Sequence, residues 1–485
     1  GDITGVVMAK YSSPILFSAH FGIDPNELDK ANLLDPFLNV DLELFIDPVL
    51  LEKCSYEEIS KGAVEDFRKY FSNVIRLLAI AEKEGDAAWK GAETLLNLKE
   101  PPENGLGYGG SSRSGSSRSD EIKQSILRTT SDIIRLGVKD PDMISLMGFF
   151  EEGVGPDTIS DFTTRVIFFR LAGITKDFCE RTNVITQRLD ENSEAELPVY
   201  DDGSGKVRPF LLVPKDIVRD LPIANDWSDV QAAAMLNDQI RTRVSQMLAG
   251  IATPTVTEYK EALRSAALSS SDAFNHFLAS VMANAKAYDA DEDILGYFRL
   301  RQLMLQDKTR FEEKSNVDLT KGPEAIRDVV LEAIGMFKKH VEVGDLWKEL
   351  WSGDKPKLER ASQIIFQLAA DAFCKANNID MSPEANMGGG PVDFKFSSGY
   401  EANVLVELKR DTGKVKHGYE VQLEHYKKAS SSFFGIFVVI DYGKLGNKLE
   451  TIQDIRNKRI VAGLRASDII VIDATPKESA SKKLI

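Results

Sequence analysis

The chain has 485 residues, 43% of them hydrophobic and 28% charged, which excludes an intrinsically disordered protein and leaves room for two or three domains. No run of about 18 uncharged apolar residues occurs, and the N-terminus lacks the basic flank and apolar stretch of a secretory signal. We therefore expect a cytoplasmic protein without a membrane partner. The three cysteines, Cys54, Cys179 and Cys374, are far apart and predict reduced, buried thiols.

The net charge of −15 at first argues against a nucleic-acid partner, because phosphate contacts draw on Lys and Arg. The charge is unevenly distributed: residues 351–485 hold 20 basic and 17 acidic residues, whereas residues 1–350 hold 40 and 58. A modestly basic C-terminal part can still bind DNA, and an acidic remainder would restrict where the polymer lies.

The N-terminal two thirds divide into three predicted segments. Residues 1–103 are mixed α/β, with an apolar run at 42–51 followed by a helix near 57–83. Residues 104–121 are rich in Gly and Ser, which predicts a loop or linker; a phosphate-binding loop is the alternative, but no Gly-Lys-Ser/Thr signature supports it. Residues 122–351 are mainly helical, with apolar residues at three- and four-residue spacing in 228–251, 270–288 and 323–351.

One acidic cluster stands out in this part of the chain. Its members suggest a second acidic site: Glu151, Glu152, Asp157 and Asp161. The segment Gly155-Pro156-Asp157 is more typical of a turn, after which Ser160 or Asp161 would cap a helix. We favour this structural interpretation, with the acidic site as the alternative.

From residue 352 to 485 the pattern changes to α-β-β-α-β followed by α-β, which predicts a mixed sheet flanked by helices. The first helix is amphipathic, and the strand at 433–441 is strongly apolar. The predicted elements are a helix at 358–377, strands at 391–396 and 403–409, a helix near 418–430, a strand at 433–441, a helix near 448–460 and a strand at 468–473.

Charged residues on the predicted hairpin suggest a catalytic site. Antiparallel pairing places Asp393 across from Val406 or Glu407, because paired positions in a hairpin have a constant sum. Glu407 and Lys409 share a face, since side chains alternate along a strand. Two close carboxylates repel unless a cation lies between them, and Mg²⁺ takes oxygen ligands of this kind. Mg²⁺ or Mn²⁺ would then activate water for phosphodiester hydrolysis, with Lys409 stabilising the developing charge.

This arrangement, Asp393 and then Glu407-Leu408-Lys409 on a hairpin after a helix, resembles the PD-(D/E)XK nuclease superfamily. The resemblance implies a restriction-endonuclease-like core of order α-β-β-β-α-β. It also implies Mg²⁺ ligation by Asp393, Glu407 and the carbonyl group of Leu408, and a catalytic role for Lys409.

The sequence departs from the family pattern in two respects. Val392 separates Pro391 from Asp393, whereas the family's proline directly precedes its aspartate. One strand of the core is also lacking, unless residues 381–387 supply an edge strand.

Further residues extend the resemblance. Gln422 and Tyr426 lie four residues apart on one predicted helical face and resemble the Gln-xxx-Tyr motif of the exonuclease-like branch, which implies a catalytic role. Glu384 precedes a Gly-rich turn and is an additional candidate metal ligand, with turn chemistry as the alternative. Glu359 is our candidate for the acid that the family often has in its first helix. A solvated helical face is nevertheless the favoured interpretation for the residues at four-residue spacing: Glu359, Gln363, Gln367 and Asp371.

The sequence thus predicts a metal-dependent DNA nuclease whose N-terminal region senses a signal, gates activity, binds a protein partner or forms a homo-oligomer. The resemblance implies a role in bacterial phage defence or restriction. Three alternatives stay open. They are a nuclease fold without activity that only binds nucleic acid or protein, cleavage of RNA in place of DNA, and a surface cross-strand ion pair formed by the hairpin charges.

Overall fold

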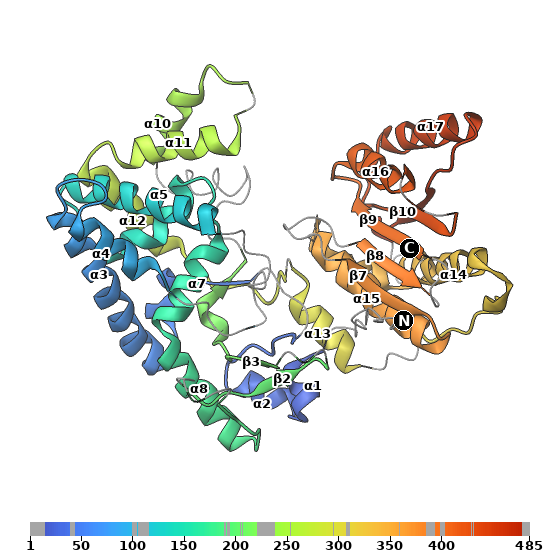
Figure 1. Cartoon of the computed structure of the whole chain (residues 1–485), viewed down its shortest axis with the longest axis horizontal. Helices are drawn as coiled ribbons and strands as arrows, with labels where there is room; N and C mark the ends of the chain where they lie inside the picture. The colour runs from blue at the N-terminus through green and yellow to red at the C-terminus, as the bar shows by residue number, and fades with distance from the viewer. Residues whose placement is uncertain are drawn as a thin grey trace, which may run out of the picture. The chain divides into compact units, whose positions relative to one another are not determined.

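The described residues fall into two compact units, an N-terminal unit (Leu16–Asp289) and a C-terminal unit (from Ala290 onward, together with Ile15). They are shown in Figure 1. The structure is a computed structural model that describes residues 15–38, 44–98, 104, 116–188, 191, 195–203, 205, 207–220, 238–252, 254–293, 295–306, 311–357, 359–384, 393–397, 403–427, 429 and 431–477.

The N-terminal unit is mainly helical, with two short antiparallel strand pairs, β1 with β4 and β2 with β3. Its strands are β1 (Phe45–Ile46), β2 (Val199–Asp201), β3 (Val207–Pro209) and β4 (Val218–Arg219). Its α-helices are α1 (Phe17–Phe21), α2 (Pro25–Lys30), α3 (Val64–Ile80), α4 (Ala87–Leu96), α5 (Ser116–Arg135), α6 (Met147–Phe150), α7 (Pro156–Val166), α8 (Phe168–Arg181), α10 (Asp238–Leu248), α11 (Val256–Ala267) and α12 (Ser271–Asn284). A π-helical segment η2 (Glu58–Ala63) leads into α3, and 3₁₀ segments occur at η1 (Pro48–Lys53), η4 (Pro141–Leu146) and η5 (Lys215–Ile217).

Side-chain caps explain where several of these helices begin. Asp86 accepts a hydrogen bond from the Trp89 N–H at the start of α4, and Ser270 accepts one from the Ala273 N–H at the start of α12. Thr255 and Glu258 form a reciprocal capping box before α11. Each cap satisfies an N–H group that has no partner within its helix.

The C-terminal unit contains a mixed sheet between helices. Its helices are α13 (Tyr297–Leu305), α14 (Pro323–Glu342), α15 (Glu359–Ala376), α16 (Val415–Glu424) and α17 (Lys448–Val461), with 3₁₀ segments η7 (Leu319–Lys321), η8 (Leu346–Leu350) and η9 (His425–Lys427). Its strands are β5 (Trp351–Ser352), β6 (Lys355–Pro356), β7 (Asp380–Glu384), β8 (Asp393–Ser397), β9 (Asn403–Arg410), β10 (Phe433–Asp441) and β11 (Asp468–Asp473).

Five of these strands form one sheet in the order β11-β10-β9-β8-β7. The strands β7, β8 and β9 pair antiparallel, and β9, β10 and β11 pair parallel. Figure 1 shows the four strands from β7 to β10 side by side. The segment predicted as an additional edge strand, 381–387, supplies β7 as far as Glu384, and its last three residues lie outside the described part of the chain.

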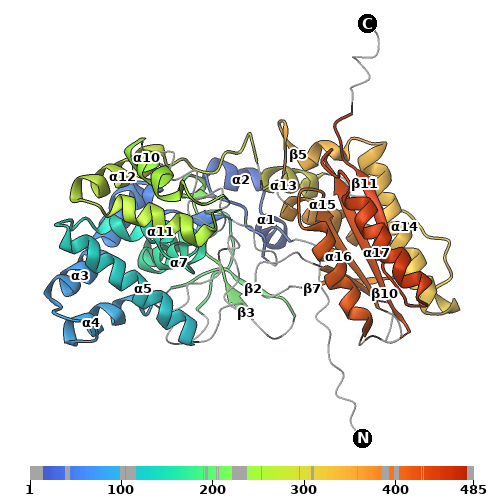
Figure 2. The same cartoon turned by 90° about the horizontal axis from the view of Figure 1, so that it is seen from above.

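Helices cover the two faces of this sheet in pairs. The helices α14 and α15 pack on the face that carries Phe394, Phe396, Val406 and Leu408, and these buried side chains belong to the main core of the unit. Figure 2 shows α16 beside α17, and both helices pack on the opposite face. That second core, here called the α16/α17 core, consists of Val415, Tyr419, Leu423, Phe437, Val439 and Ile452.

The C-terminal secondary structure agrees closely with the sequence prediction. The strands at 433–441 and 468–473 are confirmed to the residue. The helix predicted near 418–430 begins at Val415 and ends at Glu424, where a 3₁₀ turn replaces it. Helix α5 begins at Ser116, so the last residues of the predicted loop 104–121 are helical; within that segment only Asn104 and the residues from Ser116 onward are described.

Two general expectations can also be compared with the structure. Cys54, Cys179 and Cys374 are buried and form no disulfide bond, as predicted. Among the described residues, no helix is both long enough and apolar enough to cross a bilayer.

Candidate active site

The hairpin register brings three acidic positions into one row of the sheet. Asp393 on β8 pairs directly with Glu407 on β9, one of the two pairings that the sequence allowed. On its other side Asp393 pairs with Glu384 on β7. Directly opposed residues have Cα atoms about 4.5–5.5 Å apart. Glu384, Asp393 and Glu407 are therefore neighbours across three adjacent strands, and are called the acid row below.

Strand alternation assigns a face to this row. Val406 and Leu408 are fully buried in the core beneath α14 and α15, so Glu407 between them projects from the opposite face. Phe437 of β10 continues the row next to Glu407 and belongs to the α16/α17 core. Of Glu384 and Asp393 only the backbone is described. Glu407 thus lies on the side of the sheet that α16 and α17 cover over β9 and β10.

Glu407 and Lys409 form an ion pair on this face. Lys409 Nζ lies 3.6 Å from Glu407 Oε1, and the two side chains are only 12% and 7% exposed. The two residues share a face, as predicted. Glu407 is buried and Lys409 is partly buried, and both lie on one strand, so this particular ion pair is neither exposed nor cross-strand. Removing one partner of a buried pair is costly, since it leaves the other charge without compensation.

Helix α16 closes over this ion pair at Gly418. A Cβ atom at Gly418 would lie 3.0 Å from Lys409 Cε and 3.4 Å from both Glu407 Oε1 and Phe437 Cε2. Glycine therefore permits the helix to approach the two charged side chains more closely than a residue with a side chain would. The prediction from sequence gave this residue no role; a glycine inside an otherwise helical pattern was the available signal.

Gln422 and Tyr426 contact the main chain next to the acid row. Gln422 is fully buried, and its Nε2 donates to the carbonyl oxygens of Leu405 (3.3 Å) and Ile436 (3.1 Å); its Oε1 has no hydrogen-bond partner among the described residues. The Tyr426 hydroxyl accepts a 2.8 Å hydrogen bond from the Gly435 N–H. Since Tyr426 follows the end of α16, the predicted shared helical face is wrong in detail. Both side chains fasten this segment to β9 and β10, and their catalytic role stays a prediction.

The polar residues of α15 differ from expectation. Gln363, Gln367 and Asp371 are buried, at 3%, 4% and 8% exposure, so a solvated face is wrong for these three. The side chain of Glu359 lies outside the described part. Helices α13 and α14 pack against α15, and amphipathic spacing alone does not show which polar residues such neighbours will cover.

In the acidic cluster of the N-terminal unit, Glu151 is partly buried and contacts neighbouring side chains. Burial raises the pKa of Glu151, whose Oε1 contacts the Thr129 hydroxyl and lies 3.7 Å from Arg264 Nε. Helix α7 begins at Pro156, so neither Ser160 nor Asp161 is its cap; instead the Ser160 hydroxyl accepts a 3.0 Å hydrogen bond from the Ile46 N–H. The predicted helix is confirmed, whereas the predicted turn at 155–157 is wrong because Pro156 and Asp157 already belong to α7, and the predicted cap is wrong as well.

A second acidic group lies where the parallel strands end, and the sequence interpretation overlooked it: Asp411, Asp441 and Asp473. Asp411 is fully buried, and its Oδ2 accepts hydrogen bonds from the N–H groups of Tyr442 (2.9 Å) and Lys444 (2.7 Å). Burial raises the pKa of Asp441, and the neighbouring carboxylates of Asp411 and Asp473 add to this effect. An aspartate at the end of each apolar strand was the available signal.

The donor chemistry of the acid row suits a hard divalent cation, because Mg²⁺ and Mn²⁺ prefer carboxylate and carbonyl oxygens. Three carboxylate-bearing residues lie at directly paired positions of the row. Among side chains that the structure describes, no group of three or more His, Cys, Asp or Glu residues is placed to hold a metal ion, and this includes the three strand-end aspartates. Any metal centre in the row would depend on Glu384 and Asp393, whose side chains are outside that set.

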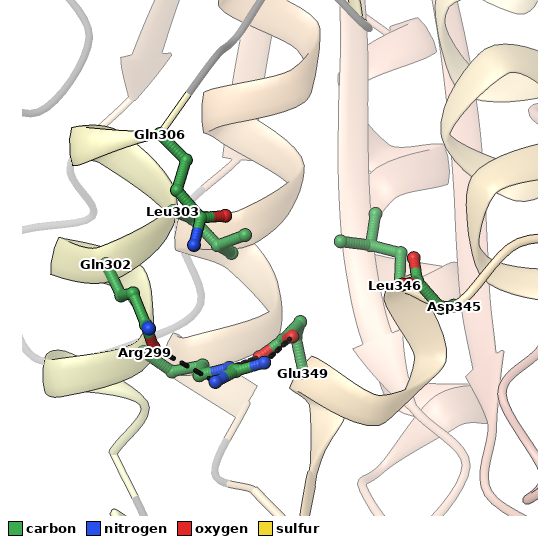
Figure 3. A pocket seen from close by; sticks show the side chains of 7 residues that line it. All are labelled: Arg299, Gln302, Leu303, Gln306, Asp345, Leu346 and Glu349. Atoms are coloured by element: carbon green, nitrogen blue, oxygen red, sulfur yellow. Dashed lines mark hydrogen bonds and ion pairs between the residues drawn. The ribbon is translucent and has the colours of Figure 1, made fainter.

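A pocket of about 90 Å³ lies elsewhere in the C-terminal unit, between α13 and η8 (Figure 3). Its lining residues are Arg299, Gln302, Leu303, Gln306, Asp345, Leu346 and Glu349. The Arg299 guanidinium donates to both carboxylate oxygens of Glu349, at 2.5 and 2.9 Å. This bidentate pair would have to open before Arg299 could bind an anionic ligand. The pocket is therefore a weaker candidate for a functional site than the acid row.

Two family models match parts of the chain. Residues 22–225 match the family described as Domain of unknown function (DUF8370), and residues 326–444 match the family described as Domain of unknown function (DUF8371). The second match begins within α14 and extends just past β10, so it contains the whole acid row with Lys409 and α16. No curated protein and no solved structure matches the chain.

Proposed function

We propose that the chain is a metal-dependent DNA nuclease whose active site is the acid row with Lys409. The observation that carries the proposal is the register: Glu384, Asp393 and Glu407 are directly paired on three adjacent strands. Acidic residues in such a row repel one another, and a divalent cation is the chemical partner that removes this cost.

The order of elements supports the same proposal. The helix α15, the strands β7, β8 and β9, the helix α16 and the strand β10 follow one another as α-β-β-β-α-β. That is the order that the resemblance to the PD-(D/E)XK nucleases implies, and β7 supplies the strand that the sequence pattern lacked. A role in phage defence or restriction rests on the resemblance alone.

In this proposal Glu384, Asp393, Glu407 and the carbonyl group of Leu408 hold the cation. When bound, Mg²⁺ or Mn²⁺ would polarise the phosphodiester and lower the pKa of a water molecule. Lys409 lies next to Glu407 on the same face and carries its charge on a flexible four-carbon stem. Its ammonium group would stabilise the negative charge that develops on the phosphate oxygens during hydrolysis.

Steric enclosure adds a second contribution from the protein. Gly418 lets α16 lie directly over Glu407 and Lys409, which keeps most of the solvent away from both side chains. Electrostatic interactions are stronger where water is excluded, so the charged groups of the row would act more strongly on a bound phosphate than they would on an open surface.

Calorimetric titration with Mg²⁺ and Mn²⁺ tests the metal site. Wild-type protein should bind the cation, and both Glu407→Gln and Asp393→Asn should lose that binding. Glu420→Gln is the matched control. It removes the same charge as Glu407→Gln, but from an exposed ion pair with Lys416 on α16. Binding by wild type that persists in both site variants would contradict this site. Absence of binding in wild type would favour an inactive nuclease fold that only binds nucleic acid or protein.

A further inference from the structure

A second lysine, Lys395, lies on the acid-row side of the sheet. It stands on β8 between Phe394 and Phe396, which are 1% and 0% exposed in the core beneath α14 and α15. Because side chains alternate along a strand, Lys395 projects from the opposite face, where Glu407 and Lys409 also lie. Lys395 itself is half-buried.

The register gives the position of Lys395 relative to the acid row. Lys395 pairs with Leu405 on β9, whereas Asp393 pairs with Glu407. It is therefore two residues, or about 6.8 Å along the strand, from the acid row. Lys409 is also two residues from the row, but β8 and β9 are antiparallel and Lys409 lies on its other side. The acid row thus has one lysine on each side.

The two halves of this face differ in what covers them. The α16/α17 core takes its strand residues from β10, and the apolar residues packed against it add Ile469 of β11; within the described part, neither group includes a residue of β7 or β8. Lys409 lies beneath α16, as the contact at Gly418 shows. Lys395 is one strand farther from that helix and is half-buried, whereas Ser397 on the same face of β8 is 8% exposed.

We propose that Lys395 is a substrate-binding residue that contacts a phosphate adjacent to the scissile one on the same DNA strand. This inference rests on the proposed nuclease function. A polymer whose scissile phosphate lies on the acid row places further phosphates on both sides of it, and a cation about 6.8 Å from the row along the strand faces one of them. Such a contact strengthens binding without taking part in bond cleavage, so its loss raises KM and leaves kcat nearly unchanged.

The test uses the full chain with Mg²⁺ and a short duplex DNA, and compares Lys395→Gln with wild type. We expect KM to rise about tenfold, as for loss of one charge-assisted hydrogen bond, with kcat close to the wild-type value. The dependence of the logarithm of affinity on the logarithm of salt concentration should lose about one unit of slope. Lys395→Arg should restore most of the affinity, and Lys416→Gln, an exposed charge loss on α16, should change neither parameter.

Fluorescence anisotropy with the same duplex and Ca²⁺ in place of Mg²⁺ separates failure of this inference from failure of the nuclease proposal. If wild type binds DNA without cutting it under any metal, the nuclease function is wrong. The proposed role of Lys395 is then tested only by the effect of Lys395→Gln on DNA affinity and on its salt dependence. Unchanged KM and salt slope in a correctly folded Lys395→Gln protein would overturn the inference. So would a fall in kcat as large as that of Lys409→Gln. A wild type that neither binds nor cuts DNA overturns both proposals.

Discussion

At the scale of single residues, burial decides what the charged groups of the C-terminal unit do. Glu407 and Lys409 are held together away from solvent, so each depends on the other for compensation of its charge. Asp411 and Asp441 are two like charges at the strand ends, and their mutual repulsion has the opposite effect on stability. The same sheet thus contains a pair of opposite charges and a pair of like charges among its buried and partly buried residues.

The sign of the second effect follows from the pKa of Asp441. Burial raises this pKa, as do the carboxylates of Asp411 and Asp473. A raised pKa means that the folded protein favours the protonated acid, so this contribution to stability is present at low pH and is lost as the pH rises through the folded-state pKa. At neutral pH the ionised Asp441 therefore lowers the free energy of unfolding.

Asp441→Asn should raise the thermal unfolding midpoint of the C-terminal unit at pH 7, and the gain should vanish below about pH 4, where the wild-type acid is also neutral. The asparagine oxygen can still accept from the Gly443 N–H, and its amide can donate to Asp411 Oδ1, which has no hydrogen-bond partner among the described residues. Melting curves of both proteins from pH 4 to pH 8 check this. An equal midpoint at pH 7 would contradict it.

Asp473→Asn is the control of opposite sign. Burial raises the pKa of Asp473, but bonds from Thr475 and Lys477 outweigh it and hold the pKa below the ordinary value. Stability from Asp473 is therefore present at neutral pH and is lost as the pH falls through the folded-state pKa. Its replacement should lower the unfolding midpoint at pH 7.

At the scale of elements, the contact of α16 with β9 determines the geometry of the candidate site. Gly418 Cα is so near Lys409 and Glu407 that an added Cβ would already be in tight contact with Lys409 Cε. Gln422 and Tyr426 hold the other end of the same segment to the backbone of β9 and β10. A change at Gly418 therefore shifts the helix, the ion pair or both.

Gly418→Val should reduce DNA cleavage by at least about 100-fold, because a displacement near 1 Å of a catalytic group has effects of that size. The thermal midpoint, measured in parallel, shows how much of the loss reflects unfolding. Val421→Leu is the control, since Val421 lies on the same helix with 46% of its side chain exposed. A folded Gly418→Val protein that cleaves at the wild-type rate would show that α16 does not position Glu407 and Lys409.

The helices and strands of the C-terminal unit could be predicted from sequence, because its apolar segments are short, strongly hydrophobic and separated by residues typical of turns. The strands β10 and β11 follow from their apolar runs, and the constant sum of hairpin positions left Val406 or Glu407 as the partner of Asp393, of which the structure has Glu407. The burial of Gln363 and Gln367 could not be predicted, because it depends on which elements pack around α15. The role of Gly418 likewise depends on a helix–sheet contact that is not local in sequence.

At the scale of the whole molecule, the division into units differs from the division by sequence pattern. Helices α13 and α14 belong to the unit that contains the sheet, whereas their periodicity had grouped them with the helical segment 122–351. Helical spacing identifies a helix but not the core it joins, so α14 was assigned by similarity to its neighbours in sequence. Its apolar face packs on the sheet beneath the candidate site.

The charges divide along the same boundary. Residues 290–485 hold 30 basic and 30 acidic residues, whereas residues 1–289 hold 30 and 45. The unit with the candidate site is therefore neutral overall, and the acidity of the chain belongs to the other unit.

The most direct test of the central claim is DNA cleavage by purified full-length protein. Supercoiled, linear and single-stranded DNA are incubated with Mg²⁺, with Mn²⁺ and with chelator, for wild type, Lys409→Ala and the exposed control Lys416→Ala. We predict cleavage by wild type and by the control that requires a metal and is lost in Lys409→Ala, whose fold is verified by melting. Metal-dependent cleavage that survives in Lys409→Ala would place the active site elsewhere, and metal-independent cleavage would contradict the proposed chemistry.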